Sequence, residues 1–140
     1  MKFPFFRKKR NSEDLELIRF ILTRFGYHPT NLAHFEQALT HRSLSNSDSD
    51  VSNERLEFLG DAILDAVIAD YLFQRFPSED EGYLTKIKSK VVSRKTLGEI
   101  GELMELRSVI RYHKGRTINL ATIEGNAFEA IMGAIYLDGG

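Results

Sequence analysis

The stretch NERLEFLGDAILDAVIADYLFQRF, Asn53 to Phe76, decides the fold of this chain. It is long, mostly apolar, and interrupted by acids at helical spacing. A helix turns by about 100° per residue, so that four of these acids fall within about 80° of one another on its circumference: Glu54, Glu57, Asp61 and Asp65. The stretch therefore predicts one helix with a narrow acidic face.

Apolar side chains cover most of the rest of this predicted helix, namely Leu56, Leu59, Ile63, Leu64, Val67, Ile68 and Leu72. A helix that is apolar over so much of its surface is expected to be buried in the domain. Its acidic face must then line a cleft, where crowded carboxylates repel one another and lose hydration. A hard divalent metal ion is the simplest cation to neutralise them.

The whole chain has the composition of one ordinary globular domain, with 140 residues, 42% hydrophobic and 28% charged. It contains no cysteine, which excludes disulfides, thiolate metal sites and cysteine nucleophiles. We expect a cytoplasmic protein. The opening MKFPFFRKKR has no apolar run long enough for a signal peptide or a membrane span, so we interpret residues 1–12 as a flexible basic arm and 13–140 as the folded domain. A solvated tail is the simplest role for the arm, and contact with nucleic acid or a membrane surface is the alternative.

The net charge of −1 conceals an uneven distribution. Residues 41–83 carry ten acids against three arginines, whereas residues 84–116 carry nine Lys or Arg against three Glu. An acidic cleft beside a basic surface suits an enzyme that acts on phosphodiesters. The basic residues that could hold a phosphate backbone are Lys86, Lys88, Lys90, Arg94 and Lys95, although a solvated face explains such a run equally well.

The remaining periodicity predicts a single all-α domain. Further helices are expected from Ser12 to Gly26, from Asn31 to about Leu39, from Tyr83 to Val92, from Ser93 or Arg94 to Met104, and from Asn119 to Leu137. A solvent loop is expected over residues 44–52 and a short extended piece over 109–114. Glycine is costly inside a helix, so Gly60, Gly125 and Gly133 predict places where helices approach closely.

The central stretch resembles the signature of the ribonuclease III family in its first part, NERLEFLGDAIL (Asn53 to Leu64). Three further blocks fit that family in order and spacing: ALTHRS (Ala38 to Ser43), EGYLT (Glu81 to Thr85) and GNAFEAIMGAIYLDG (Gly125 to Gly139). The resemblance covers roughly residues 15–140. It implies an all-α, homodimeric endoribonuclease that cuts double-stranded RNA with Mg²⁺, or Mn²⁺ in its place, leaving 5′ phosphates and short 3′ overhangs in rRNA and mRNA processing.

The resemblance also implies roles for single residues. The metal ligands would be Glu57, Asp61, Asn126 and Glu129, with Asp61 and Glu129 catalytic. Glu54 and Glu81 would lie near the cleavage centre of the dimer, and Phe58 would pack across the dimer interface. Spacing agrees, because Glu57 and Asp61 share one helix face, as do Asn126 and Glu129, and a crossing near Gly60 would bring these oxygens to one point.

Asn126 departs from the common pattern of the family, which has aspartate there. An amide oxygen still ligates a metal but brings no charge, so weaker metal affinity is expected. This leaves a second hypothesis open: a non-catalytic module that binds structured RNA, for example on the ribosome. We expect no small-molecule cofactor, no membrane partner, and a structural role for His41. No separate double-stranded RNA-binding domain is recognisable, and the end of the chain just after a helix suggests a fragment of a longer protein.

Overall fold

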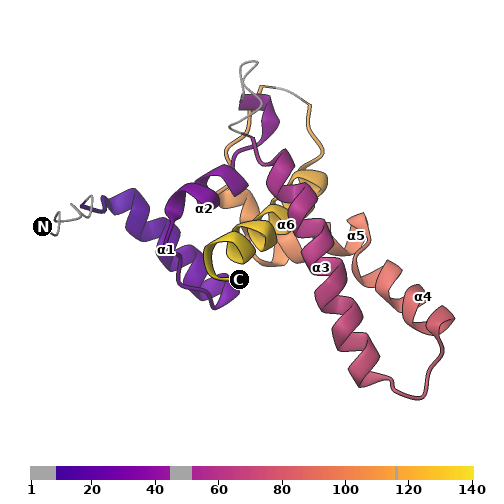
Figure 1. The fold of residues 1–140 in the computed structure, drawn as a ribbon. Helices are drawn as coiled ribbons and strands as arrows, with labels where there is room; N and C mark the ends of the chain where they lie inside the picture. The colour runs from indigo at the N-terminus through magenta and orange to yellow at the C-terminus, as the bar shows by residue number, and fades with distance from the viewer. Residues whose placement is uncertain (1–8, 45–51, 116) are drawn as a thin grey trace, which may run out of the picture.

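The structure, a computed structural model, describes residues 9–44, 52–115 and 117–140. In these ranges the chain forms six α-helices: α1 (Ser12–Phe25), α2 (Leu32–Ala38), α3 (Glu54–Arg75), α4 (Glu81–Val91), α5 (Arg94–Leu103) and α6 (Leu120–Gly139). Two short 3₁₀ turns, η1 (Arg42–Leu44) and η3 (Leu106–Ser108), and one isolated bridge between Thr40 and Arg111 complete it. The all-α prediction is confirmed for the described residues (Figure 1).

Local capping explains where the first helix begins and ends. The Asn11 side chain accepts a hydrogen bond from the Asp14 backbone N–H, and Asp14 accepts one in return from the Asn11 backbone. Asn11 is therefore the cap, one residue before the predicted Ser12. At the other end, Gly26 takes φ = 66°, the left-handed conformation that glycine adopts without strain, and ends α1 as predicted.

The other helix starts follow the same rule. Asn31 caps α2 as predicted. Ser93 and Asn119 cap α5 and α6, whose predicted starts lay at Ser93 or Arg94 and at about Asn119. The prediction for α4 was wrong by two residues, because Asp80 accepts a hydrogen bond from the Tyr83 backbone and starts the helix at Glu81. Phe76 ends α3 just before Pro77, as the proline predicts.

The core of the domain is built around α6, which lies behind α3 and beside α5 in Figure 1. Eight residues of α6 are buried: Ile123, Glu124, Gly125, Ala127, Ala130, Ile131, Gly133 and Ala134. Side chains from α1, α2 and η3 close the core around them, among them Ile21, Phe35 and Leu106, all without exposed surface. The deepest helix is thus α6 rather than α3.

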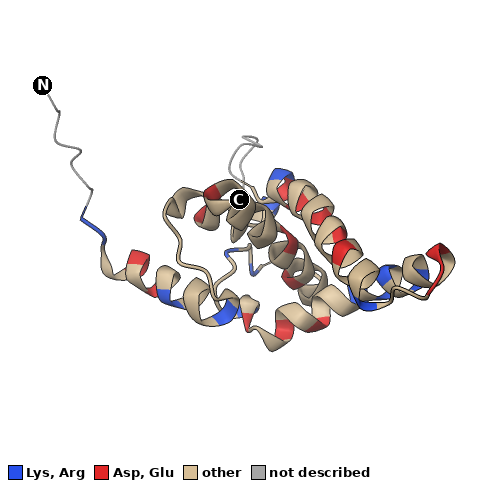
Figure 2. Ribbon diagram, turned by 60° about the horizontal axis from the view of Figure 1, so that its bottom comes forward, with Lys and Arg blue, Asp and Glu red and all other residues tan. Residues whose placement is uncertain are grey.

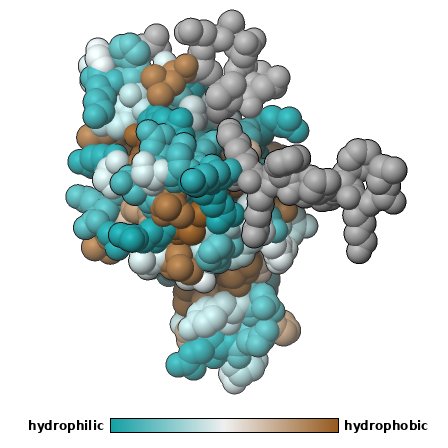
Figure 3. Space-filling model, turned by 90° about the vertical axis from the view of Figure 1, so that its left-hand side faces the viewer, coloured by the Kyte–Doolittle hydropathy of each residue, from teal (hydrophilic) through white to brown (hydrophobic). Residues whose placement is uncertain are grey.

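The expectation that α3 is buried was wrong for much of its length. Its buried residues are Leu56, Gly60, Leu64 and Leu72, all on the side that packs against α6 or α4. Other apolar side chains of α3 face solvent in the single chain, and Phe58 is 82% exposed. The side view of Figure 3 shows apolar surface, in brown, above the projecting lower end of the molecule.

Glycines allow the close helix crossings, as predicted. A Cβ atom at Gly60 would overlap the carbonyl group of Glu129 on α6, and one at Gly133 would stand 3.2 Å from the Gly60 nitrogen. Gly125 lies equally close to α5, where an added Cβ would be 3.2 Å from the nitrogen of Gly98. Backbones at this distance leave no room for side chains between them, so α3 and α5 are set directly against α6.

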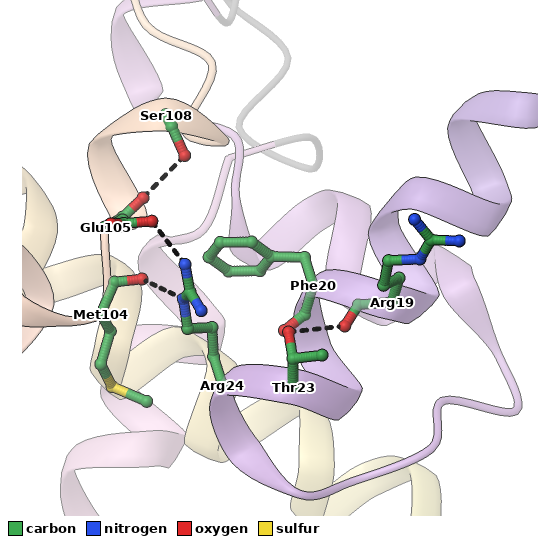
Figure 4. A network of polar contacts seen from close by, with 7 residues as sticks. All are labelled: Arg19, Phe20, Thr23, Arg24, Met104, Glu105 and Ser108. Atoms are coloured by element: carbon green, nitrogen blue, oxygen red, sulfur yellow. Dashed lines mark hydrogen bonds and ion pairs between the residues drawn. The ribbon is translucent and has the colours of Figure 1, made fainter.

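A polar network joins α1 to the turn after α5 (Figure 4). The Arg24 Nε donates to the Met104 carbonyl at 3.1 Å, and its guanidinium pairs with the Glu105 carboxylate. Glu105 has φ = 59°, which only glycine adopts cheaply, and Ser108 Oγ donates to its carbonyl oxygen. The contacts of Arg24 and Ser108 therefore hold an unfavourable backbone turn that connects α5 to η3.

Some predictions fall on residues outside the described ranges. Residues 1–8 of the basic arm and 45–51 of the predicted loop lie there. Ser52, at the end of that loop, was expected in solvent, and this prediction was wrong. The residue is only 2% exposed, because it lies against α2, where its carbonyl oxygen accepts a hydrogen bond from the Gln37 side chain. No helix in the described residues is long and apolar enough to cross a membrane.

Candidate active site

The acidic face predicted for α3 exists, and Figure 2 shows acids, in red, recurring along this helix. Glu54 and Glu57 lie in its first turn, which Asn53 opens from a buried position with its side-chain amide donating to the Ala38 carbonyl at 3.1 Å. Asp61 and Asp65 follow at one-turn intervals. The start of α3 is thus anchored to α2, which holds Glu54 and Glu57 in place.

The second group of predicted ligands comes from α6. Asn126 and Glu129 are both half-buried, one turn apart, on the helix that crosses α3 at Gly60. Because Gly60 touches the backbone of Glu129, Asp61 and Glu129 are neighbours across this crossing. The crossing near Gly60 that the spacing predicted is confirmed.

The carboxylates of this group act on one another electrostatically. Partial burial, followed by the charges of Asp61, Glu57 and Asp65, raises the pKa of Glu129 to about 7, against the opposing charge of Arg94. Burial, with Glu54 next, also raises the pKa of Glu57. The acids of α3 and α6 therefore form one coupled group.

A cavity of about 400 Å³ lies beside this group. Glu54, Glu57 and Asn126 line it on the acidic side. The rest of its wall comes from the start of η1, from the start of α3, and from the first turn of α6 with the segment before it. These residues are His41, Arg42, Asn53, Thr117, Ile118, Asn119, Thr122 and Ile123. Most of the lining residues are polar, and Glu57 and Asn126 border the same cavity.

Two arginines lie close to the acids. Arg42 pairs with Glu54 at 3.4 Å, and the charge of Arg94 at the start of α5 opposes the raised pKa values of both Glu57 and Glu129. Lys86, Lys88 and Lys90 lie on α4 and are not among the main causes of either pKa shift. Of the five predicted phosphate-binding residues, the structure thus brings Arg94 to the acidic group.

Two predicted residues do not reach the acidic group within one chain. Glu81 begins α4, at the end of α3 far from Glu57, and its carboxylate accepts a hydrogen bond from Thr85 at 3.0 Å (Figure 1). The 18 residues from Glu57 to Arg75 at about 1.5 Å each make this separation roughly 25 Å. Phe58 points to solvent on the exposed side of α3.

The donor set suits a hard divalent cation, although the side chains are not gathered around a single point. In the described part of the chain, no three Asp, Glu, His or Cys side chains stand close enough to hold one ion as they are. The mutual repulsion of these acids, which contributes to the raised pKa of Glu129, is what a bound cation would relieve. Carboxylate and amide oxygens are the ligands that Mg²⁺ accepts.

Sequence reasoning missed two further carboxylates. Glu124 is 1% exposed and pairs with Arg107, whose Nη2 lies 2.6 Å from its Oε1. Asp138 accepts hydrogen bonds from the Tyr27 hydroxyl, from the backbone N–H and hydroxyl of Thr30, and from the Asn31 backbone. The partners of Asp138 lie more than 100 residues away in sequence, so no local pattern pointed to them.

Comparison with known proteins agrees with the motifs. The model of the family described as ribonuclease-III-like matches residues 31–140. Ribonuclease 3 of Zunongwangia profunda is 50% identical over 121 residues, which are 82% of this chain and 49% of that protein. Ribonuclease 3 of Phocaeicola vulgatus is 45% identical over 138 residues, 96% of this chain and 43% of that protein. The chain spans about half the length of these curated relatives.

Solved structures give the same result for the fold. The nuclease domain of ribonuclease III from Campylobacter jejuni superposes with a TM-score of 0.78 at 33% identity, covering 88% of this chain and 87% of that one. Dicer from Pichia stipitis, at 24% identity and a TM-score of 0.62, shares the fold over 81% of this chain. By sequence motifs, family match and fold, the chain belongs to the ribonuclease-III-like family.

Proposed function

We propose that this chain is the catalytic domain of a double-stranded RNA endoribonuclease that hydrolyses phosphodiesters with Mg²⁺. One observation carries the proposal: Glu57, Asp61 and Glu129 form a coupled acidic group where α3 crosses α6. The names of the relatives support the same activity. The products would carry 5′ phosphates and short 3′ overhangs, and the setting would be rRNA and mRNA processing in the cytoplasm.

The metal would be held by Glu57, Asp61, Asn126 and Glu129, with Asp61 and Glu129 nearest to the reaction. Bound there, Mg²⁺, or Mn²⁺ in its place, would lower the pKa of a water and stabilise the leaving oxygen. Arg94, which already lies close enough to influence Glu57 and Glu129, would place positive charge beside the scissile phosphate.

A dimer would complete the arrangement. One structure of the Campylobacter jejuni nuclease domain is described as having structural flexibility in a region involved in dimer formation. In this chain Phe58 is 82% exposed on the helix that carries the acids, and burial of so large an aromatic in a second copy would be favourable. A second copy would also supply another Glu81 and Glu54, and two acidic groups would cut the two strands of one RNA duplex. Lys86, Lys88 and Lys90 would then contact the phosphate backbone.

The test is cleavage of a perfectly paired RNA by the purified protein over a series of Mg²⁺ concentrations. The wild type should cut in proportion to metal occupancy, and Glu129→Gln should not cut although it retains the fold. Asp70→Asn is the matched control, because Asp70 lies on α3 and, within the described ranges, its carboxylate accepts a hydrogen bond only from Gln74 on its own helix.

Failure of the wild-type dimer to cut at any Mg²⁺ concentration would refute the enzyme. If the same protein still bound the duplex, the non-catalytic RNA-binding module would be the better interpretation. Asn126 is the feature that favours this second function, because it removes one negative charge from the predicted ligand set.

A further inference from the structure

His41 is one of the residues that line the 400 Å³ cavity beside the acidic group. One edge of the ring is fixed by Ser43, which does not line the cavity. The Ser43 backbone N–H donates to His41 Nδ1 at 3.1 Å, and the Ser43 hydroxyl lies 2.8 Å from the same nitrogen. His41 is thus bonded within the local packing, as the structural interpretation expected.

These contacts determine which ring nitrogen carries the proton. A backbone N–H can only donate, so Nδ1 must accept and is unprotonated. The Ser43 oxygen accepts from the His113 backbone N–H at 2.8 Å, which leaves its own hydrogen free to point at Nδ1 as well. The neutral ring therefore carries its proton on Nε2, at the opposite edge.

The Nε2–H group has no acceptor among residues 9–44, 52–115 and 117–140. His41 lines the cavity together with Glu57 and Asn126. Burial lowers the pKa of His41, and the charge of Arg42 lowers it further against that of Glu54, so the ring stays neutral near neutral pH. A residue with a fixed, neutral donor therefore lines the space next to the acids.

We propose that the Nε2–H of His41 donates a hydrogen bond to an oxygen of the ribose–phosphate backbone and so positions the RNA strand in this cavity. The proposal rests on the proposed function and deepens it by assigning a positioning residue. The acceptor is either a 2′-hydroxyl or a non-bridging phosphate oxygen.

A purely structural role is the competing explanation. The backbone of His41 donates to the Arg111 carbonyl at 2.9 Å, next to the Thr40–Arg111 bridge, so replacement of the ring could simply loosen this junction. The variants must therefore keep the Ser43 contact and remove the donor alone. Asparagine does so, because its amide oxygen can accept at the place of Nδ1 while nothing reaches the place of Nε2. Glutamine instead reaches the place of Nε2 with an N–H.

The first experiment is ¹⁵N NMR of the imidazoles in the Glu129→Gln protein, which would hold RNA uncut. In the free protein His41 should show the Nε2–H tautomer, and a paired RNA should shift its Nε2 resonance. His28, exposed in the turn before α2, should not shift. An Nδ1–H tautomer, or an unchanged Nε2 resonance in the RNA complex, would overturn the proposal whether or not the wild type cuts RNA.

The second experiment compares cleavage by His41→Asn, His41→Gln and the control His28→Asn. We expect kcat/KM to fall about 10- to 100-fold for His41→Asn, as for loss of one hydrogen bond to a charged or strongly polar oxygen, with partial rescue by glutamine. Melting temperatures should stay alike. Wild-type cleavage by His41→Asn, or equal loss in the asparagine and glutamine variants, would show that the ring does not position RNA.

Altered RNA identifies the acceptor. If a 2′-deoxy nucleotide beside the cut abolishes the difference between wild type and His41→Asn, the acceptor is the 2′-hydroxyl. If a phosphorothioate does so, the acceptor is the phosphate. If neither modification reduces the difference, the proposed hydrogen bond is not made. A wild type that cuts no RNA at all would refute the proposed function separately, and the NMR experiment would still decide the role of His41.

Discussion

Gly60 of α3 and Glu129 of α6 touch through their backbones, and a Cβ atom at Gly60 would overlap the Glu129 carbonyl. Gly60→Ala should therefore push the two helices apart and lower the free energy of unfolding by about 3 kcal/mol or more, at the upper end of overpacking effects. Urea unfolding measures this. Gly82→Ala is the control, because its Cβ would stand 3.5 Å from Asp80 Oδ1 in ordinary contact. Equal stability of the two variants would mean that the crossing can relax.

The raised pKa of Glu129 makes the metal-free protein less stable as pH rises. Between pH 4.5 and about 7 the folded protein holds a proton that the unfolded chain has lost, so stability falls through this window. The full shift corresponds to about 3 kcal/mol, which solvent screening at a half-buried site reduces to about 1–2 kcal/mol. Without metal, Glu129→Gln should be more stable than wild type by this amount near pH 8 and equal to it near pH 4. A constant difference across pH would contradict the assignment.

Asn126→Asp should restore a fourth charge to the predicted ligand set. We expect the Mg²⁺ concentration for half-maximal cleavage to fall roughly tenfold, since one additional carboxylate strengthens binding of a hard cation. Asn119→Asp is the matched control, because Asn119 lines the same cavity and caps α6, and aspartate caps equally well. A similar shift in both variants would mean that general charge, rather than ligation, is responsible.

Phe58→Glu should convert a dimer to a monomer, which sedimentation velocity at micromolar concentration would detect. Removal of a buried aromatic anchor commonly costs about 2–4 kcal/mol of binding free energy, and a charge at its place costs more. Leu103 on α5 is 83% exposed, almost the same as Phe58, so Leu103→Glu controls for the added charge. Loss of the dimer in both variants, or in neither, would show that Phe58 does not contribute specifically to the dimer interface.

Asp138 should protect the fold against acid. Burial opposes its ionisation, but the hydrogen bonds from Thr30, Asn31 and Tyr27 outweigh this effect and lower its pKa to about 2. Its stabilising contribution is thus present above pH 4 and is lost as pH falls towards 2. Asp138→Ala should cost about 2–3 kcal/mol at neutral pH, and the difference from wild type should shrink as the acid transition is approached. A loss that is independent of pH would point to packing alone.

Local chemistry predicted most of the helix boundaries. Gly26, Asn31, Ser93 and Asn119 act as the caps that their residue types suggest, because a cap is satisfied within three or four residues. At the other end of the chain, α6 continues to Gly139, two residues beyond the predicted Leu137. The two errors at helix starts are also local. Asn11, rather than Ser12, caps α1 because it forms a reciprocal pair of hydrogen bonds with Asp14. Asp80 caps α4, so that this helix begins two residues before Tyr83.

Burial was harder to predict than helicity. The apolar surface of α3 suggested a fully buried helix, but periodicity cannot distinguish a side chain that meets its own core from one, such as Phe58, that is left exposed. Pairings across the fold were equally hidden, as Asp138 with Thr30 and Glu124 with Arg107 demonstrate. At the site, motif spacing predicted the crossing at Gly60. The cavity that His41 lines was not predicted, because its wall comes from segments that are far apart in the sequence.

The position of α6 has a consequence for the order in which the protein is made. Five of the six described helices lie within the first 119 residues, yet α3 and α5 pack mainly against α6. A ribosome releases these helices first, at about 5–20 residues per second, so that several seconds of synthesis pass before their common partner emerges. Native packing, including the approach of Asp61 to Glu129, must therefore wait for α6, and the nascent chain carries an incomplete acidic group until then.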